Sequence, residues 1–402
     1  MTLKSGQNLV ILLLGLLTAF GPLSIDMYLP AFPKLASDLG VEISLVQFSL
    51  GAYIIGMSLG QVFYGPLSDK HGRKRSLVIG LVIYILASLG CLWVESITGL
   101  IVLRFIQGLG GCAGTVMSRA VVRDLFDGEQ AAKVFSLLML IMGLAPILAP
   151  SLGGLLLKVS SWRMIFAVLS TVGIIAFILV VKLLPETVSE ENRNPLALKE
   201  AFGNYKNIVK DKEFVGFLFA GGMIQAGLFA YITGSAFVFM KIFGLNESQY
   251  GIVFGMNAFG LIFFSQVNRY LLNHYTIKEI LRVVIAVNAI CAVALFLCGV
   301  FEIGGLVGVM IPLFMCMSTL GMIFPNATAG ALVNHAKSAG SASALLGTLM
   351  MAFGAISALC VSAFANGTII PMVSIIMVCS LISFSVFFLF VKTPVSRAEL
   401  IN

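Results

Sequence analysis

Two long stretches without a charged side chain constrain this sequence more than any other feature. Residues 283–300 and 369–391 contain no Asp, Glu, Lys or Arg. A helix needs about 20 mainly apolar residues to cross a bilayer, and these stretches approach or exceed that length. Neither stretch alternates apolar and polar residues, as the strands of a membrane β-barrel do. The sequence therefore predicts a helical membrane protein, whose spanning helices satisfy their own backbone hydrogen bonds.

The composition of the whole chain supports this prediction. Of its 402 residues, 59% are hydrophobic and 11% are charged, whereas about a quarter of the residues in soluble domains are charged. Apolar segments of spanning length predict an all-α polytopic membrane protein with twelve transmembrane helices. The expected spans lie near 9–30, 45–66, 76–94, 98–119, 133–157, 164–184, 213–240, 248–268, 280–300, 304–329, 339–365 and 369–391.

The distribution of cationic side chains predicts the orientation of these spans. Alternate loops, together with both termini, carry 20 of the 25 Lys and Arg residues. The other side holds Lys34, Lys158, Arg163 and Lys241, and Arg104 falls inside a span. Because cytoplasmic loops are enriched in Lys and Arg, both termini are expected in the cytoplasm. The net charge of +7 then reflects topology, and no nucleic-acid partner is expected.

The longest polar stretch between spans, residues 185–212, is expected to be a cytoplasmic linker between two bundles of six helices. The predicted bundles comprise residues 1–184 and 213–402, the second ending in a short cytoplasmic tail. The apolar spacing within the linker suits an amphipathic helix on the membrane surface, and a loose tether remains the alternative. Two six-helix halves are typical of transporters that rock about a midplane site.

The strongest local pattern is the run 65–75, Gly-Pro-Leu-Ser-Asp-Lys-His-Gly-Arg-Lys-Arg, between the second and third spans. Gly65 and Gly72 allow a tight turn, and Asp69 can cap the third helix or face another helix terminus. A plain cytoplasmic loop explains the cations but not this spacing. Arg73 and Asp124, both at cytoplasmic helix ends, form a plausible charge pair.

This run resembles the signature loop of the major facilitator superfamily, Gly-x-x-x-Asp-Arg/Lys-x-Gly-Arg-Lys/Arg. Further runs at 24–30, 104–108, 145–154, 324–327 and 339–344 resemble the bicyclomycin-resistance branch of drug:proton antiporters, over essentially the whole chain. The resemblance implies alternating access and export of small drug-like molecules in exchange for protons, with no cofactor beyond the coupling ion. It also implies a bacterial inner membrane and a latch between the halves made by the signature loop with Asp124. We expect a monomer.

In that family, an element Gly-x-x-x-Gly-Pro-x-x-Gly-Gly in the fifth span is associated with export. Here Ala145 and Ala149 replace its first two glycines, which keeps the face small. The paired prolines are equally consistent with a kinked helix. The expected antiporter element comprises Pro146, Pro150, Gly153 and Gly154.

Asp26 is expected to be the only acidic side chain deep within a span. A carboxylate in the middle of a spanning helix costs about 2.5–3.5 kcal/mol, which points to a functional role. The alternative is an acid at the outer end of its helix, given Pro30 four residues later. Asp26 is the predicted site of proton coupling.

Arg104 is the matching cation in the fourth span. It can pair with Asp26 or donate to the backbone of the first helix, and it stays protonated. Burial disfavours the charged carboxylate whereas a nearby Arg favours it, so Asp26 is expected to exchange its proton with conformation. A purely structural buried ion pair remains an alternative.

Candidate substrate-binding residues combine apolar bulk with polar tips inside the expected spans. Methionine adapts to ligands of several shapes, although each candidate can equally serve packing. The candidates are Tyr28, Tyr53, Met139, Met142, Gln225, Tyr231 and Asn257.

Three other classes of function compete with export. A proton-coupled symporter or a facilitator for a small metabolite would share the fold. An intramembrane enzyme needs clustered acids, bases or metal ligands, and neither such a cluster nor a nucleotide-binding loop stands out. The seven cysteines contain no Cys-x-x-Cys pair, so no metal site is expected. A selective channel lacks a visible filter or charge ring.

Overall fold

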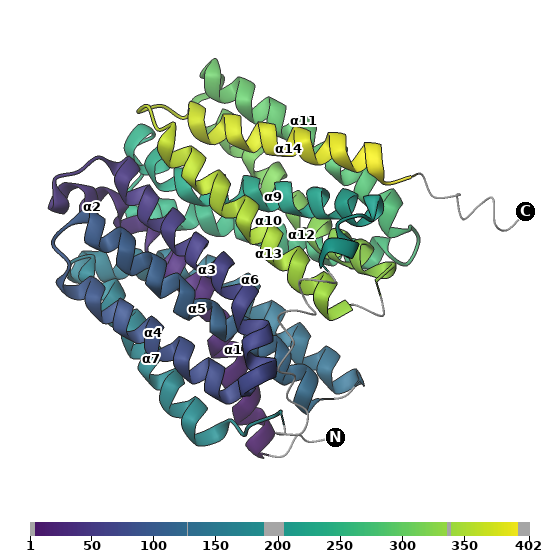
Figure 1. The fold of residues 1–402 in the computed structure, drawn as a ribbon. Helices are drawn as coiled ribbons and strands as arrows, with labels where there is room; N and C mark the ends of the chain where they lie inside the picture. The colour runs from purple at the N-terminus through teal and green to yellow at the C-terminus, as the bar shows by residue number, and fades with distance from the viewer. Residues whose placement is uncertain (1–4, 127, 189–204, 336–338, 393–402) are drawn as a thin grey trace, which may run out of the picture. The chain divides into compact units, whose positions relative to one another are not determined.

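The computed structural model describes residues 5–126, 128–188, 205–335 and 339–392, and in this part of the chain every regular element is a helix (Figure 1). The elements before the linker are α1 (Ser5–Asp26), η1 (Leu29–Ala31), α2 (Phe32–Leu39), α3 (Ile43–His71), α4 (Arg73–Trp93), α5 (Ile97–Leu125), α6 (Gly128–Val159) and α7 (Arg163–Leu183). Those after it are α9 (Lys212–Ala236), the π-helix η3 (Phe237–Ile242), α10 (Glu247–Leu271), α11 (Ile277–Val300), α12 (Gly305–Val333), α13 (Ala339–Ala363) and α14 (Ile370–Phe390).

Eleven helical segments of the described residues are long and apolar enough to cross a membrane. The remaining predicted span corresponds to α6, in which the described apolar stretch covers Ile147–Val159. α1, η1 and α2 form one such segment, Leu9–Leu39, and α9 and η3 form another, Lys212–Ile242. The predicted all-α polytopic fold is therefore confirmed.

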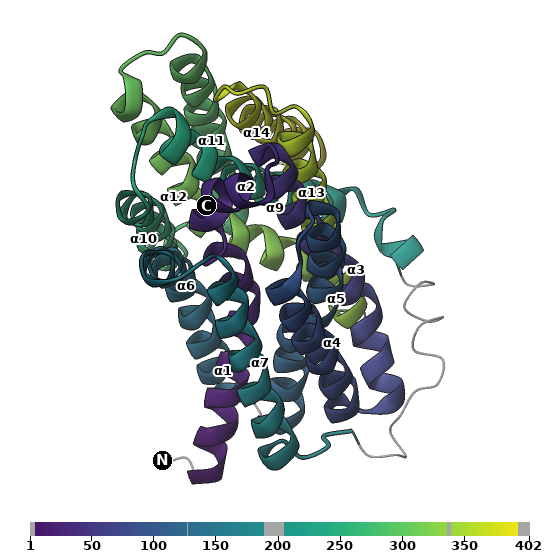
Figure 2. The ribbon, with the colours of Figure 1, turned by 90° about the vertical axis from the view of Figure 1, so that its left-hand side faces the viewer.

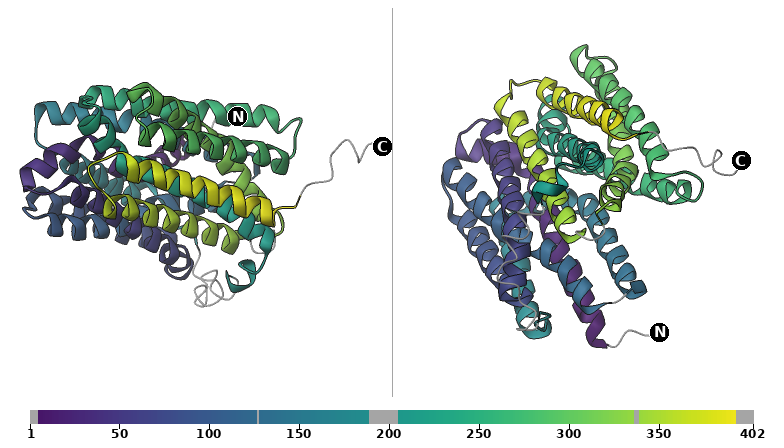
Figure 3. Two further views of the ribbon diagram at one scale, coloured as in Figure 1. Left: turned by 90° about the horizontal axis from the view of Figure 1, so that it is seen from above. Right: turned by 45° about the vertical axis from the view of Figure 1, so that its right-hand side comes forward.

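Contacts divide the chain into two units. The first unit comprises Met1–Phe202 with Ile232–Gly255, and the second comprises Gly203–Tyr231 with Met256–Asn402. In the first unit α5 packs against α3 and α4, and α4 also packs against α7 (Figure 2). In the second unit α11 packs against α12 and α14 (Figure 3). Residues 189–204 of the predicted linker lie outside the described residues, so the domain boundaries and the linker's conformation stay predictions.

Small residues allow α3 and α5 to approach each other closely. A Cβ at Gly108 of α5 would overlap the carbonyl oxygen of Tyr53, and one at Gly56 of α3 would overlap that of Phe105. The two helices therefore touch through their backbones. Close approach of this kind is how membrane helices gain packing energy where lipid is as apolar as a leucine side chain.

The first helix ends at Asp26, four residues before the predicted end of its span. Pro30 has no N–H, so it cannot donate to the carbonyl of Asp26 as residue i+4 of a helix would. The chain turns through Met27 and Tyr28 and resumes as η1 and α2. The expectation that Asp26 lies in the middle of a helix was therefore wrong, because the proline removes the hydrogen bond that would continue α1.

The predicted loop between the second and third spans is a single residue. α3 continues to His71 and α4 begins at Arg73, so Gly72 alone joins them. Its φ of 96° and ψ of 152° lie in a region that only glycine occupies readily. Gly65 lies inside α3, so the expectation that it forms part of the turn was wrong.

Candidate functional site

Arg104 anchors a buried polar cluster of the first unit. It lies in α5 and is fully buried, and its Nη2 donates a hydrogen bond of 2.9 Å to the carbonyl oxygen of Ser24 in the last turn of α1. This is the second of the two arrangements predicted for Arg104. Among the described residues, neither a hydrogen bond nor an ion pair joins Arg104 to Asp26.

Aromatic rings surround the Arg104 guanidinium. Its central carbon lies 4.6 Å from the ring centroid of Tyr28 and 4.3 Å from that of Tyr53, with Phe166 of α7 at 5.8 Å. Cation–π contacts contribute about 0.5–2 kcal/mol each, more when water is excluded. The Tyr28 hydroxyl lies 2.8 Å from that of Ser49, which fixes the ring. The rings therefore stabilise a cation that forms no ion pair with any carboxylate of the described residues.

Gln107 completes this cluster, and sequence reasoning did not assign it a role. Arg104 Nη1 donates to Gln107 Oε1 at 2.5 Å, and Gln107 Nε2 donates to Ser88 Oγ of α4 at 2.7 Å. The sequence spacing could have predicted this contact, because residues three apart share a helix face and Gln107 follows Arg104 by three. The cluster thus links α1, α4 and α5.

Asp26 lies beside this cluster without belonging to it. Its side chain is 3% exposed, and no hydrogen bond or ion pair to it is found within the described part of the chain. The carboxylate sits where α1 stops, two residues beyond the carbonyl that Arg104 holds. A buried acid without a fixed partner has the means to change its protonation state with its surroundings.

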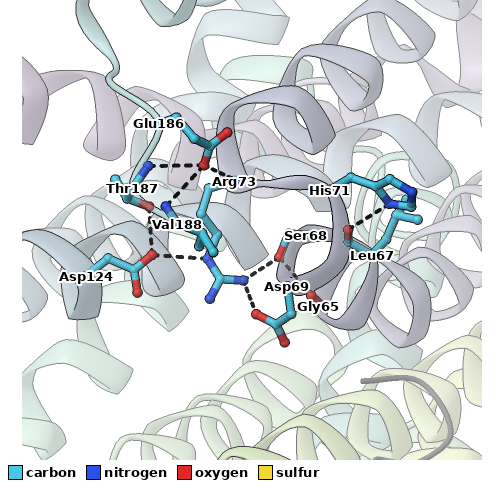
Figure 4. A network of polar contacts seen from close by, with 10 residues as sticks. All are labelled: Gly65, Leu67, Ser68, Asp69, His71, Arg73, Asp124, Glu186, Thr187 and Val188. Carbon is cyan, nitrogen blue, oxygen red and sulfur yellow. Dashed lines mark hydrogen bonds and ion pairs between the residues drawn. The ribbon is translucent and has the colours of Figure 1, made fainter. Parts of the chain in front are cut away.

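The predicted pair of Arg73 and Asp124 is present in the second polar cluster (Figure 4). Arg73 Nε donates to Asp124 Oδ2 at 3.1 Å, and Arg73 Nη1 bonds to Ser68 Oγ at 2.5 Å and to Asp69. Asp69 lies in α3 and makes no cap hydrogen bond to α4. The expectation that it caps the third helix was wrong, because Gly72 occupies the cap position.

Glu186, just beyond α7, closes the same cluster and was not predicted. Its Oε1 accepts the backbone N–H of Arg73 at 2.8 Å and that of Thr187 at 3.0 Å. Thr187 Oγ1 donates to Asp124 Oδ2 at 2.7 Å. A carboxylate at the start of α4 satisfies an N–H that the helix itself cannot, and it complements the helix dipole. The cluster therefore ties the ends of α3, α4, α5 and α7.

The predicted antiporter element lies on one continuous helix, α6. A Cβ at Gly153 would overlap the carbonyl oxygen of Met27, so α6 touches the chain just after Asp26 by backbone contact. A Cβ at Gly154 would lie 3.3 Å from Cβ of Glu247. Ala149 and Pro150 are buried. Pro146 also falls in α6, and its side chain lies outside the described residues.

The substrate candidates fall into separate groups. Tyr28 and Tyr53 join Arg104 in the first unit. In the second unit Asn257 Nδ2 donates to the Tyr231 hydroxyl at 3.0 Å. The remaining three are Gln225, which donates to Met351 Sδ at 3.7 Å, Met142, which is partly buried, and Met139, whose side chain lies outside the described residues. Their part in binding substrate stays a prediction.

No group of three or more His, Cys, Asp or Glu that could hold a metal ion occurs among the described residues.

Residues 14–359 match the Major Facilitator Superfamily. The chain is 38% identical over 387 residues to the uncharacterized MFS-type transporter YdgK of Bacillus subtilis, covering 96% of both chains. It is 35% identical over 383 residues to a bicyclomycin resistance protein homolog of Haemophilus influenzae, covering 95% of this chain and 96% of that protein.

A solved structure of a D-xylose-proton symporter has the same fold, with a TM-score of 0.76 over 97% of this chain and 98% of that one. Its sequence identity of 14% supports the fold alone. The extent of the family match, together with relatives that align over nearly their full length, identifies a multi-pass membrane transporter rather than an enzyme. The chain belongs to the major facilitator superfamily.

Proposed function

We propose that this transporter exports small, partly apolar, drug-like molecules in exchange for protons. It works as a monomer by alternating access in a bacterial inner membrane, with both termini in the cytoplasm. The observation that carries the proposal is the burial of Asp26, without an ion pair in the described chain, at the break after α1. The similarity to a bicyclomycin resistance protein homolog supports the class of cargo.

Asp26 is the proposed proton carrier. An isolated carboxylate is costly to bury, and protonation removes that cost. When the site opens to the outside, Asp26 takes a proton and the drug leaves. When it opens to the cytoplasm, the proton departs as drug binds. A proton moving inward across 100 mV releases about 2.3 kcal/mol, which drives each cycle.

Arg104 is the proposed positioning residue for Asp26. It holds the Ser24 carbonyl at 2.9 Å and lies against the rings of Tyr28 and Tyr53. These contacts fix the backbone on either side of Asp26 while leaving its carboxylate free of the guanidinium. Any shift of α5 against α1 therefore changes the surroundings of the carboxylate, which is what coupling requires.

The cluster around Arg73 is the proposed conformational latch. Asp69, Arg73 and Asp124 tie helix ends within the first unit, and Gly72 sets the junction at which they meet. Gly65 lies in open space on α3, with no described atom within 4 Å of a Cβ placed there. The uncrowded position of Gly65, beside the charge cluster, leaves room for another part of the chain to pack there in only one state of the cycle.

Efflux from proteoliposomes under an imposed pH gradient tests the proposal. Asp26→Asn is compared with wild type and with Asp38→Asn, which removes an exposed carboxylate from α2. We expect the gradient to drive transport of a lipophilic drug by wild type and Asp38→Asn, but not by Asp26→Asn. An equal response of all three proteins would place proton coupling elsewhere. Accumulation of the drug in energised cells, rather than its loss, would indicate import.

A further inference from the structure

We propose that the first unit binds an anionic phospholipid in a groove between α1, α6 and α7. One acyl chain fills an apolar cavity, and the headgroup phosphate lies against Lys34 and Lys158, whose contacts place them at the end of α6. The inference is independent of the proposed transport reaction. It rests on a cavity without polar groups and on cations without acidic partners at the end of that cavity.

The cavity has a volume of about 470 Å³, within the range of about 300–1,000 Å³ found for small-molecule sites. Leu23 of α1 and Met27, just after its end, form one wall, Leu155 and Val159 of α6 a second, and Val172 of α7 a third. All the lining residues are Leu, Met or Val. Sites for drugs and metabolites carry a few polar groups that orient the ligand. A hydrocarbon chain needs none.

The cavity is accessible from the side of the helix bundle. Leu155 is 57% exposed and Val159 is 82% exposed, although both line the cavity. On a spanning helix, such side chains contact lipid tails. An acyl chain can therefore enter directly from the surrounding leaflet.

Lys158 lies at the end of α6 that borders the cavity, and the amine of Lys34 reaches the same end from α2. The Lys34 amine donates to the carbonyl oxygen of Ser160 at 3.2 Å and to that of Leu157 at 3.4 Å, on either side of Val159. Lys158 donates to Ser248 Oγ at 2.9 Å. An ammonium group has three donors, so both amines retain hydrogen-bonding capacity for a phosphate.

Arg163 begins α7 a few residues further along the chain. It donates to the carbonyl oxygens of Leu92 and Val94 at 3.1 and 3.0 Å, and its guanidinium lies 4.3 Å from the ring centroid of Trp162. These contacts turn Arg163 towards the end of α4, away from the face of α7 that lines the cavity, so it lies outside the proposed site. In the described chain, neither Lys34 nor Lys158 forms an ion pair with a carboxylate. A phosphate supplies the missing negative charge with short, charge-assisted hydrogen bonds.

Trp162 follows by two residues the Ser160 carbonyl that Lys34 contacts, and it serves as a reporter for this site. The chain has two tryptophans. Trp93 is 72% exposed at the end of α4, so Trp93→Phe leaves Trp162 as the sole tryptophan. The protein is placed in phosphatidylcholine nanodiscs, and phosphatidylglycerol brominated in its acyl chains is titrated in. Bromine quenches tryptophan fluorescence at short range, and Trp162 is fully buried from bulk lipid.

We expect brominated phosphatidylglycerol to quench Trp162 at lower mole fractions than brominated phosphatidylcholine does. Each cation near an anionic membrane surface contributes about 1 kcal/mol, so Lys158→Gln or Lys34→Gln should weaken the effect about fivefold. Lys182→Gln, which removes an exposed cation at the opposite end of α7, is the matched control and should have no effect. Val172→Phe, which fills the cavity, should reduce quenching by both lipids.

Equal quenching by the two lipids, unaffected by Lys158→Gln, would overturn the headgroup assignment. Quenching that survives Val172→Phe would overturn the acyl-chain assignment. Displacement of the brominated lipid by a transported drug would assign the cavity to the substrate instead. Thermal unfolding in detergent confirms that each variant is folded, so a loss of quenching reports binding and not collapse of the site.

Discussion

Arg104 holds the carbonyl oxygen of Ser24 at 2.9 Å, and Asp26 follows only two residues later at the end of α1. The cation therefore fixes the backbone beside the carboxylate instead of neutralising it. Tyr28 and Tyr53 stack on the guanidinium and take the place of a counter-ion. The hydrogen bond to Ser24 thus sets the backbone position beside Asp26, whereas the tyrosine rings stabilise the charge of Arg104.

Replacing the guanidinium by an amine tests this arrangement. Arg104→Lys keeps the charge, but a compact ammonium cannot reach Ser24 and Gln107 together while stacking on the tyrosines. We expect a loss of about 1–3 kcal/mol in stability, because buried acceptors lose their partner. The measurement is thermal unfolding of the purified protein in detergent. An unchanged melting temperature would show that charge alone matters at position 104.

Gln107 is expected to be needed for the same cluster. Gln107→Leu leaves Arg104 Nη1 and Ser88 Oγ without the partners they have in the native protein. Each lost buried hydrogen bond costs about 1–3 kcal/mol when its partner stays unsatisfied. Ser88→Ala removes the bond from Gln107 and the bond from Ser88 Oγ to the carbonyl oxygen of Tyr84, but it keeps the bond between Arg104 and Gln107 and is the control. Equal melting temperatures of the two variants would contradict the idea that Gln107 holds Arg104.

Gly153 is expected to tolerate no side chain. Gly153→Ala places a methyl group against the carbonyl oxygen of Met27, a backbone atom that can move only with the end of α1. Overpacking of this kind costs about 1–3 kcal/mol. Gly227→Ala is the matched control, since no described atom lies within 4 Å of its new Cβ in α9. There alanine should be neutral, or stabilising by up to about 1 kcal/mol.

Glu186 is expected to stabilise the start of α4. Glu186→Ala removes the acceptor of the Arg73 backbone N–H and frees the segment after α7. We expect a lower melting temperature, corresponding to about 1–3 kcal/mol. Glu95→Ala removes an exposed acid from the loop between α4 and α5 and should leave stability unchanged. Equal melting temperatures of the two variants would show that Glu186 does not stabilise the start of α4.

The spans were predictable from local patterns, and the pair of Arg73 with Asp124 was predictable because both residues fall at helix ends that were expected on the cytoplasmic side. Apolar length determines a spanning helix, and the positive-inside distribution of cations assigns each helix end to a side of the membrane. Glu186 was not predictable, since it reaches Arg73 across 113 residues of sequence and no periodicity relates the two. The end of α1 was marked by Pro30, but hydropathy alone extended the span through it, because the apolar segment continues into α2.

The contact of Gly153 with Met27 has a consequence for how sequences of this kind can diverge. Both partners contribute main-chain atoms, so the spacing between α6 and the turn after Asp26 does not depend on the side chain at position 27. That side chain is free to drift among apolar residues, while position 153 admits glycine only. Glycine at position 153 thus preserves the backbone spacing beside Asp26 even when many of the surrounding side chains change.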